Sequence, residues 1–446
     1  MAAGPGARDA DLIVVGGGVA GLEAARRVKR AGLRVVVLEA RPRVGGRIDT
    51  HRPPGWPSPV EGGAEFVHGR PRALLRALAA AGAKVVEVSG GRRLVEGGVA
   101  RVAAGQWHRA LRAMDRLPDE DVDFASVARR PDVRRALSPE ELALLLGFVE
   151  GFNAADATRI SVAGLNRQTR ESETEQGDRA FRVRGGYDAL PLDLAARLEP
   201  GALHLSTVVR EIRWGPRGAE VTAQGAFGGP PLALRGRAVL VTVPLGVLQA
   251  APGQPGALRF TPPLPAAKRR AIRHLAMGNV VKVVVRARVE IGTGVLSLFG
   301  RRATSLSTPG AAVPTWWVPW RPGRVLVGWV AGPAADRFAG AHSPDARAAA
   351  ALDSLARVLR VRPGDMAAAV EDARTFDWRA DPYARGAYSW IPVGGLEAPA
   401  ALALPVGGCL FFAGEATDTA GDPGTVHGAL ATGARAAREI ISGFGR

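Results

Sequence analysis

The chain has 446 residues, 47% of them hydrophobic, so it can bury a large core and is expected to form two domains. It has no run of eighteen uncharged apolar residues and only one cysteine, Cys409, which excludes a membrane-spanning helix, an internal disulfide framework and a cysteine-based zinc site. The net charge of +17 comes from scattered arginines without a basic stripe, so no specific nucleic-acid partner is expected. A short N-terminus without an apolar leader favours the cytoplasm.

The first forty residues carry the clearest motif. An apolar β-branched run, 12–15, predicts a strand buried on both faces, and Gly16, Gly18 and Gly21 follow it as G-x-G-x-x-G before a helical segment. A second apolar run ends at Glu39, where an acid is expected to meet a ribose hydroxyl. This order predicts a dinucleotide-binding unit. An acid at this position disfavours the 2′-phosphate of NADP, so FAD and NAD remain.

The segment after Glu39 favours FAD. A loop with two glycines between arginines is suited to fold back over a pyrophosphate, and such an extension is unusual in plain NAD-binding units. It resembles the arginine-containing loop of the glutathione-reductase-like FAD superfamily. The expected cofactor contacts are Ala40, Arg41, Gly45, Gly46 and Arg47.

The next candidate segment is 60–69. Small residues at Gly62, Gly63 and Ala64 allow a backbone to approach a flat ring. The polar residues of the segment are candidate site groups, although a loop with surface acids has the same pattern: Glu61, Glu65 and His68.

Later segments return to the same unit. The strands expected at 203–212 and 220–223 place Val209 as a possible contact on the adenine side. Lys282 interrupts a valine-rich strand at 280–289, where it is either a lysine at a sheet edge or a buried functional group. The acidic cluster 119–123 is expected to be a solvated helix start, and no metal site is expected.

Two C-terminal segments complete the pattern. A polar aromatic stretch, 378–390, leads into a strand, and a strand ending at Gly414 and Glu415 precedes the last helix, which begins near Thr425. That helix N-terminus can face an electron-rich carbonyl.

Together these residues resemble the flavin-containing amine oxidase family, which includes monoamine oxidases, polyamine oxidases and lysine-specific histone demethylases. The resemblance covers almost the whole chain, and its most specific parts are 38–47, 244–248, Lys282, 378–389 and 411–429. It implies an α/β fold with a glutathione-reductase-like FAD-binding Rossmann domain and a second domain of mixed sheet and helices for the substrate. The expected FAD domain comprises 1–75, 185–262 and 385–446, and the substrate domain comprises 76–184 and 263–384.

The resemblance also implies roles for residues. Lys282 would hold a water near flavin N5, and Trp378 would lie against the isoalloxazine. Tyr388 would form one wall of an aromatic cage, with Trp390 as a further substrate contact. Glu415 would lie near the ribityl chain, and Thr425 and Val426 would face the pyrimidine edge, with Gly414 as a further cofactor contact.

Departures from monoamine oxidases narrow the expectation. Ala387 stands where those enzymes carry a flavin-linked cysteine, so FAD is expected to be noncovalent, and Cys409 to be a small core residue. Thr425 replaces the second cage aromatic, as in polyamine oxidases, and Glu61 and His68 match the polyamine oxidase pattern, in which they help to place a cationic amine.

The implied reaction transfers a hydride equivalent from an amine to flavin N5, followed by imine hydrolysis and reoxidation by O2 to hydrogen peroxide. A polyamine or other secondary amine is the first substrate hypothesis, with acids supplied by Glu61, Glu65, Glu171, Glu173 and Glu175. A primary monoamine, an L-amino acid or a secondary-metabolite amine (oxidised or desaturated) remain alternatives, as does a non-catalytic flavin-binding protein. Sequence does not distinguish a monomer from a homodimer.

Overall fold

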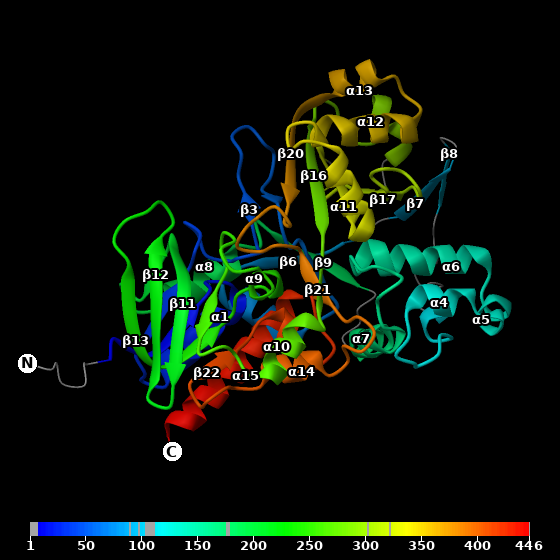
Figure 1. Cartoon of the computed structure of the whole chain (residues 1–446). Coiled ribbons are helices and arrows are strands. Elements are labelled where there is room, and N and C mark those ends of the chain that lie inside the picture. The colour runs from blue at the N-terminus through cyan, green and yellow to red at the C-terminus, as the bar shows by residue number, and fades with distance from the viewer. Residues whose placement is uncertain are drawn as a thin grey trace, which may run out of the picture.

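A computed structural model of the chain describes residues 8–88, 91–96, 99–102, 112–174, 179–300, 303–320 and 323–445. Two large sheets organise the molecule (Figure 1). The first has eight strands in the order β10-β2-β1-β13-β12-β11-β14, with β22 paired to β13. Its strands are β1 (Ala10–Val15), β2 (Val35–Leu38), β10 (Leu203–His204), β11 (Thr207–Gly215), β12 (Gly218–Gly225), β13 (Leu232–Val241), β14 (Arg259–Thr261) and β22 (Leu410–Phe412).

Strand β1 lies at the centre of this sheet, parallel to β2 on one side and β13 on the other. Its side chains alternate between two cores: Leu12 and Val14 pack into one cluster, and Ile13 and Val15 into the other. The uninterrupted apolar run is therefore explained by burial on both faces, as predicted.

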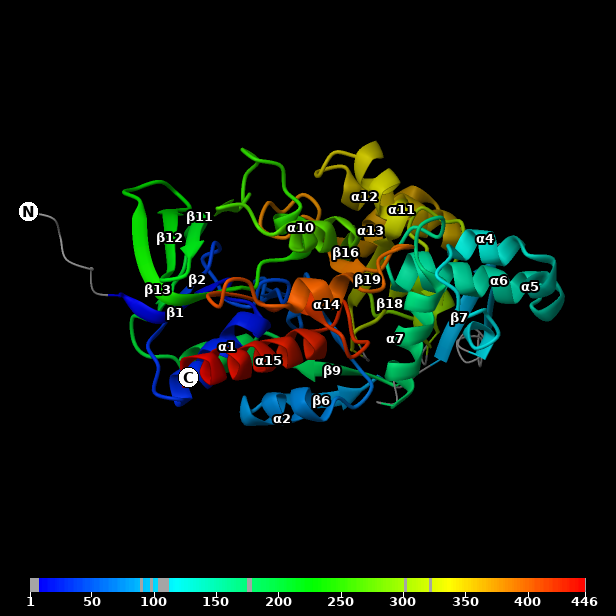
Figure 2. The same ribbon diagram turned by 60° about the horizontal axis from the view of Figure 1, so that its bottom comes forward.

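Helices cover both faces of the first sheet. Helices α1 (Val19–Arg30) and α15 (Val426–Phe444) lie alongside each other on one face (Figure 2). Side chains of α2 (Arg72–Ala80) and α8 (Ala189–Ala196) join the same core. The opposite face is covered by α9 (Leu245–Leu248), α10 (Ala266–Arg273) and α14 (Ala398–Ala403).

The second large sheet has the order β20-β16-β19-β18-β17-β7-β8 and builds the other half. Its strands are β7 (Gly91–Glu96), β8 (Val99–Val102), β16 (Val280–Ala287), β17 (Ala303–Ser307), β18 (Thr315–Trp317), β19 (Val325–Ala331) and β20 (Val370–Asp377). Its core also takes in residues of α11 (Gly332–Ala341), α12 (Arg347–Leu359), α13 (Pro363–Ala369) and the 3-10 turn η2 (Gly294–Phe299).

A helical group with its own apolar core completes this half. It contains α4 (Phe124–Arg129), α5 (Pro131–Ala136), α6 (Pro139–Leu146), the π-helix η1 (Gly147–Phe152) and α7 (Val162–Thr174). Small sheets and a turn join the two halves: β3 (Thr50–His51) with β4 (Val60–Glu61), β5 (Phe66–His68) with β9 (Ala180–Arg184) and β6 (Lys84–Glu87), β15 (Ala276–Gly278) with β21 (Tyr388–Trp390), and η3 (Glu415–Thr417).

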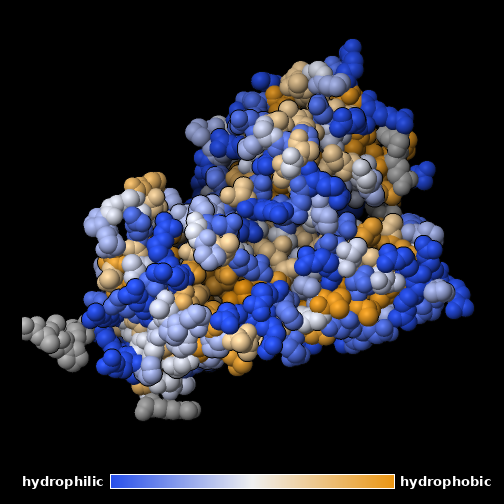
Figure 3. Space-filling model, in the orientation of Figure 1, coloured by the Kyte–Doolittle hydropathy of each residue, from blue (hydrophilic) through white to orange (hydrophobic). Residues whose placement is uncertain are grey.

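The cores place some segments beside the first sheet that the sequence assigns to the second domain. Leu78 and Val183 pack with α1 and α15, and Ile272 packs under the opposite face. The domain boundaries themselves stay a prediction. Hydrophilic residues cover most of the face in Figure 3, with apolar residues gathered where the two halves meet. Within the described ranges, no helix combines the length and apolarity needed to cross a membrane.

Candidate active site

The glycine loop after β1 has the shape that a pyrophosphate site requires. Gly16 has φ +115°, and a Cβ at Gly21 would lie 2.1 Å from the Gly16 carbonyl oxygen, so the loop and α1 pack too closely for a side chain. A Cβ at Gly18 would meet nothing within 4 Å, and Gly18 lines a large cavity at the start of α1. The backbone at this helix start therefore borders open space, where an anion can approach it.

Glu39 follows β2 and is buried in the wall of the same cavity. Its carboxylate accepts hydrogen bonds from the Gly17 amide at 2.7 Å and the Arg41 amide at 2.9 Å. These bonds fix the acid beside the glycine loop, as the dinucleotide motif predicts.

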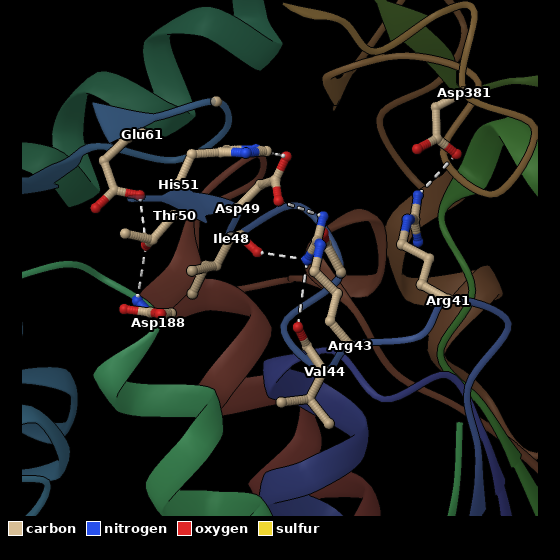
Figure 4. Close-up of polar contacts among 12 residues, drawn as sticks. Arg41, Arg43, Val44, Ile48, Asp49, Thr50, His51, Glu61, Asp188 and Asp381 are labelled. Carbon is tan, nitrogen blue, oxygen red and sulfur yellow. Dashed lines mark hydrogen bonds and ion pairs between the residues drawn. The ribbon is translucent and has the colours of Figure 1, made fainter. Parts of the chain in front are cut away.

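The arginine loop is held by its own side chains (Figure 4). Arg43 donates to the carbonyls of Val44, Gly46 and Ile48 and forms an ion pair with Asp49 at 2.8 Å. Arg41 pairs with Asp381 at 2.8 Å across 340 positions of sequence. Arg47 donates to the Ala387 carbonyl and to Glu415, both at 2.8 Å. The loop is thus tied to the segment that carries the aromatic residues.

One cavity of about 940 Å³ connects the two halves of the molecule. It extends from Gly18 and Glu39 to Lys282 and Tyr388, so the glycine loop and the distant aromatic segment share one space. The other predicted site residues in its lining are Gly16, Ala40, Arg41, Gly45, Gly46, Arg47, Gly62, Gly63, Ala64, Glu65, His68, Val209, Trp378, Gly414, Glu415, Thr425 and Val426.

Lys282 is 1% exposed and forms an ion pair with Glu65, whose side chain is 6% exposed. Its Nζ lies 2.7 Å from Glu65 Oε2 and donates to the Gly63 carbonyl at 3.2 Å. Glu65 also accepts from Arg182 and from the Trp317 indole, each at 2.8 Å. Burial alone would raise the pKa of Glu65, but the nearby charges of Lys282 and Arg182 outweigh it and lower that pKa.

The aromatic residues are positioned by hydrogen bonds to the backbone. Buried Trp378 donates its indole N–H to the Gly62 carbonyl at 3.0 Å, and the Tyr388 hydroxyl donates to the Phe152 carbonyl at 2.6 Å. Burial raises the pKa of Tyr388, so the phenol stays neutral. Tyr388 is paired with Gly278 in the β15–β21 ladder, and this pairing fixes the position of its backbone beside the cavity.

The C-terminal segment supplies a second helix start. Buried Glu415 accepts from the Ser389 hydroxyl at 2.6 Å and from the Gly424 amide at 2.9 Å, in addition to Arg47. Thr425 is the N-cap of α15, and its Oγ1 accepts from the Gly428 amide at 2.9 Å.

Two predicted substrate contacts, Glu61 and Trp390, lie outside the cavity lining, and their role toward a substrate stays a prediction. Glu61 accepts from the Thr50 hydroxyl at 2.7 Å and the Tyr187 amide at 2.8 Å, so its carboxylate joins β3, β4 and the start of α8 (Figure 4). Trp390 packs in the core of the helical group beside Ala276. Gly21 also lies outside the lining, because its place is in the contact between α1 and the loop.

The acids expected to line a polyamine path are only partly described. Glu175 and the side chains of Glu171 and Glu173 lie outside the described part of the chain. His68 does line the cavity. Burial, together with the nearby charges of His427 and Arg92, lowers the pKa of His68 to about 4, so the imidazole is neutral near pH 7.

The π-helix η1 contributes lining residues that the sequence analysis did not identify. Phe148, Glu150 and Phe152 all face the cavity, and the two phenyl rings stack with centroids 5.2 Å apart. Burial raises the pKa of Glu150, and the charge of Arg337 opposes this rise. The sequence feature that could have indicated this segment is the pair of glycines within the helical run Gly-Phe-Val-Glu-Gly-Phe. The irregular helix that forms there is of a kind that often occurs at functional sites.

The fold and cavity define a flavin-dependent oxidoreductase, and comparisons agree. The flavin containing amine oxidoreductase family matches residues 94–441, and the NAD(P)-binding Rossmann-like domain family matches 14–81. The chain belongs to the flavin containing amine oxidoreductases. The predicted fold class and the FAD cofactor are confirmed, and the open space beside Gly18 and the fixed Glu39 carboxylate fit this dinucleotide.

Individual relatives of the chain include a polyamine oxidase and a lysine-specific histone demethylase homolog. Polyamine oxidase 2 of Arabidopsis thaliana is 29% identical over 97% of this chain and 88% of that protein. Lysine-specific histone demethylase 1 homolog 3 of Arabidopsis thaliana is 28% identical over 96% of this chain but only 30% of that protein. The demethylase-like relatives are thus much longer than the chain.

Among solved structures, wild-type putrescine oxidase bound to putrescine has a TM-score of 0.77 and 25% identity, covering 97% of this chain and 99% of that one. Cyclohexylamine oxidase from Brevibacterium oxydans IH-35A has a TM-score of 0.77 at 21% identity, which shows the shared fold alone.

Proposed function

We propose that the protein is an oxidase of small amines that attacks the C–N bond of a polyamine or another secondary or primary amine. The observation that carries this proposal is the shared cavity, in which Lys282, Trp378 and Tyr388 lie at one end and the dinucleotide loop at the other. FAD, when bound, supplies a hydride acceptor that oxygen can reoxidise, giving hydrogen peroxide.

The chain's own groups would orient a neutral amine and keep water away. Tyr388 is a neutral phenol with its hydroxyl held by Phe152, and His68 is a neutral imidazole, so neither carries a charge that would repel a protonated amine as it enters. Orientation against an aromatic wall brings the reacting carbon close to the cofactor. Ala387 at the cysteine position of monoamine oxidases and buried Cys409, outside the cavity lining, support noncovalent FAD.

The carboxylates of the described lining support recognition of one remote ammonium group at most. Glu39, Glu65 and Glu415 are engaged by donors of the chain itself. Glu150, which has the Ala157 amide and the charge of Arg337 nearby, is the remaining carboxylate of this lining and is the group we propose for a second amine of the substrate.

An amine that bears a carboxylate is the second candidate. Arg92, Arg93 and Arg337 also belong to the lining, and a cationic wall favours an anionic group on the substrate. The two candidates predict different substrates, because one requires a cation and the other an anion at a distance from the reacting nitrogen.

An anaerobic screen tests both candidates. Bleaching of bound FAD is followed with putrescine, spermidine, N-acetylated polyamines, benzylamine, tyramine and L-amino acids. At least one amine is expected to reduce the flavin, with a rate that rises with pH as the bound amine loses its proton. A protein that binds FAD but is reduced by none of these amines would contradict the proposal, and a rate independent of pH across the amine pKa would contradict the neutral-amine requirement.

A further inference from the structure

Lys282 is buried in a place where a lysine needs a partner. Strand β16 lies between β19 and β20, with Lys282 opposite Trp329 on one side and Phe376 on the other, so Lys282 is not on an edge strand. Its side chain is 1% exposed. A buried ammonium needs a counter-charge or acceptors at such a position, because desolvation disfavours the charged form.

Glu65 provides that partner and is itself fixed in place. Its Oε1 receives Arg182 Nε and the Trp317 indole N–H, both at 2.8 Å, and its Oε2 lies 2.7 Å from Lys282 Nζ. The two oxygens of Glu65 therefore have different partners: Oε1 is held by Arg182 and Trp317, and Oε2 faces Lys282. Arg182 is held in turn by the Pro319 carbonyl at 3.2 Å and by the Phe66 ring, whose centroid lies 4.4 Å from the guanidinium carbon.

The charges near Lys282 are those of one further cation and two carboxylates. The ionisable groups that face it are Glu65 from the segment before β5, Arg182 from β9 and the more distant Glu61 from β4. Glu65 offsets one of the two cations. An ammonium has three N–H donors, and Glu65 and the Gly63 carbonyl engage two of them, so one is left for the cavity that Lys282 lines.

We propose that Glu65 is the positioning residue of Lys282: it holds the lysine as an ammonium with one N–H directed to the cavity, where the lysine acts as a fixed positive charge and not as a proton acceptor. This inference rests on the proposed function for its kinetic part only, since the charge state can be measured without substrate.

Glu65→Gln is the decisive variant, because it keeps the shape and an oxygen for the Trp317 indole but removes the negative charge. Only the more distant Glu61 would then face the buried cations Arg182 and Lys282, and Lys282 should lose its proton within the accessible pH range. The visible spectrum of bound FAD, titrated from pH 6 to 10, should show a new ionisation in Glu65→Gln. Wild type, Glu65→Asp and the double variant Glu65→Gln/Lys282→Met should lack it.

The kinetic readout is a double-mutant cycle on FAD reoxidation by oxygen after reduction with dithionite. Lys282→Met should retain FAD and slow reoxidation. Glu65→Gln should slow it roughly 10- to 100-fold, the range by which losing an orienting partner weakens metal ligands, and should have almost no effect in the Lys282→Met background. Glu65→Asp, which keeps the charge, should recover most of the rate.

Other outcomes would overturn the inference. A Glu65→Gln spectrum that titrates like wild type, or an equal loss of rate in both lysine backgrounds, would make Glu65 a purely structural residue. Loss of FAD from Lys282→Met would make the lysine itself structural. If Glu65→Gln does not fold, Glu65→Gln/Arg182→Met removes the second buried cation as well and should show the same new ionisation. Failure of every amine to reduce the flavin would contradict the proposed function while leaving this test readable.

Discussion

Glu61 is a buried carboxylate with two possible roles, as a ligand of the substrate or as a structural link between elements. Burial raises the pKa of Glu61 to about 7, while the Tyr187 amide and the Thr50 hydroxyl favour the charged form and oppose this rise. Its position in the sequence, seven residues before His68, is the same whether it binds an amine or joins two strands to a helix. Only the contact with Tyr187, 126 positions away, separates these roles.

This placement predicts a pH dependence of stability that Glu61→Gln should remove. The folded-state pKa lies above the unfolded value, so the folded protein binds the extra proton between about pH 4.5 and 7. The contribution of Glu61 to the unfolding free energy is fully present below pH 4.5 and is lost as the pH rises through 7. The difference in unfolding free energy between Glu61→Gln and wild type should therefore change in favour of the variant by about 2–3 kcal/mol from pH 4.5 to 8.

Chemical denaturation at several pH values measures that difference. Because Glu61 lies outside the cavity lining, the variant should keep the KM of any amine that reduces the flavin. A several-fold rise in KM with an unchanged stability profile would instead place Glu61 in contact with the substrate.

At the scale of elements, the close pair α1 and α15 connects the glycine loop to the last helix. A Cβ at Gly433 would lie 2.3 Å from the Ala20 carbonyl oxygen, on the turn of α1 that follows Gly18. The two helices can approach this closely because Gly433 has no side chain. Any widening of the pair moves the helix start that lines the cavity.

Gly433→Ala is expected to destabilise the protein by about 1–3 kcal/mol, the usual cost of overpacking, and to weaken FAD binding. Gly443→Ala on the same helix is the matched control, because nothing lies within 4 Å of the added Cβ and alanine favours a helix by about 1 kcal/mol over glycine. Thermal unfolding and FAD titration measure both effects. Equal effects of the two substitutions would contradict a role for the close contact.

The elements differ in how far sequence could predict them. The strand at 12–15 and its glycine turn follow from local rules, because burial on both faces and a tight turn each leave a mark on neighbouring residues. Lys282 is different: whether its strand is central or at an edge depends on pairing with β19 and β20, which lie tens of residues away. The π-helix at Gly147–Phe152 depends on a hydrogen-bond shift that ordinary helical residues also permit.

The candidate site was predictable to the extent that family motifs covered it. The motifs indicated Trp378, Tyr388 and Glu415, which the structure brings to one cavity with the glycine loop. No motif indicated the ion pair between Glu65 and Lys282, because it joins residues 217 positions apart and either residue alone has a surface explanation.

For the whole molecule, the net charge of +17 acts on everything that approaches the cavity. FAD carries a negatively charged pyrophosphate, so long-range attraction should speed its encounter with the apoprotein. A polycationic amine experiences the opposite force, and only local acids such as Glu150 could compensate for it near the binding position. Cofactor and substrate should therefore respond to salt in opposite directions.

Stopped-flow measurement of FAD association with apoprotein tests this effect. The association rate constant should fall about tenfold or more between 20 and 500 mM NaCl, because the Debye length shrinks from roughly 20 Å to under about 5 Å and screens the attraction. The dissociation rate constant is the internal control and should change far less, since short-range contacts, which we expect at the glycine loop, would hold the bound cofactor. An association rate that is insensitive to salt would mean that the arginines are distributed so evenly that their fields cancel at the cavity mouth, and the net charge would then have no part in loading the enzyme.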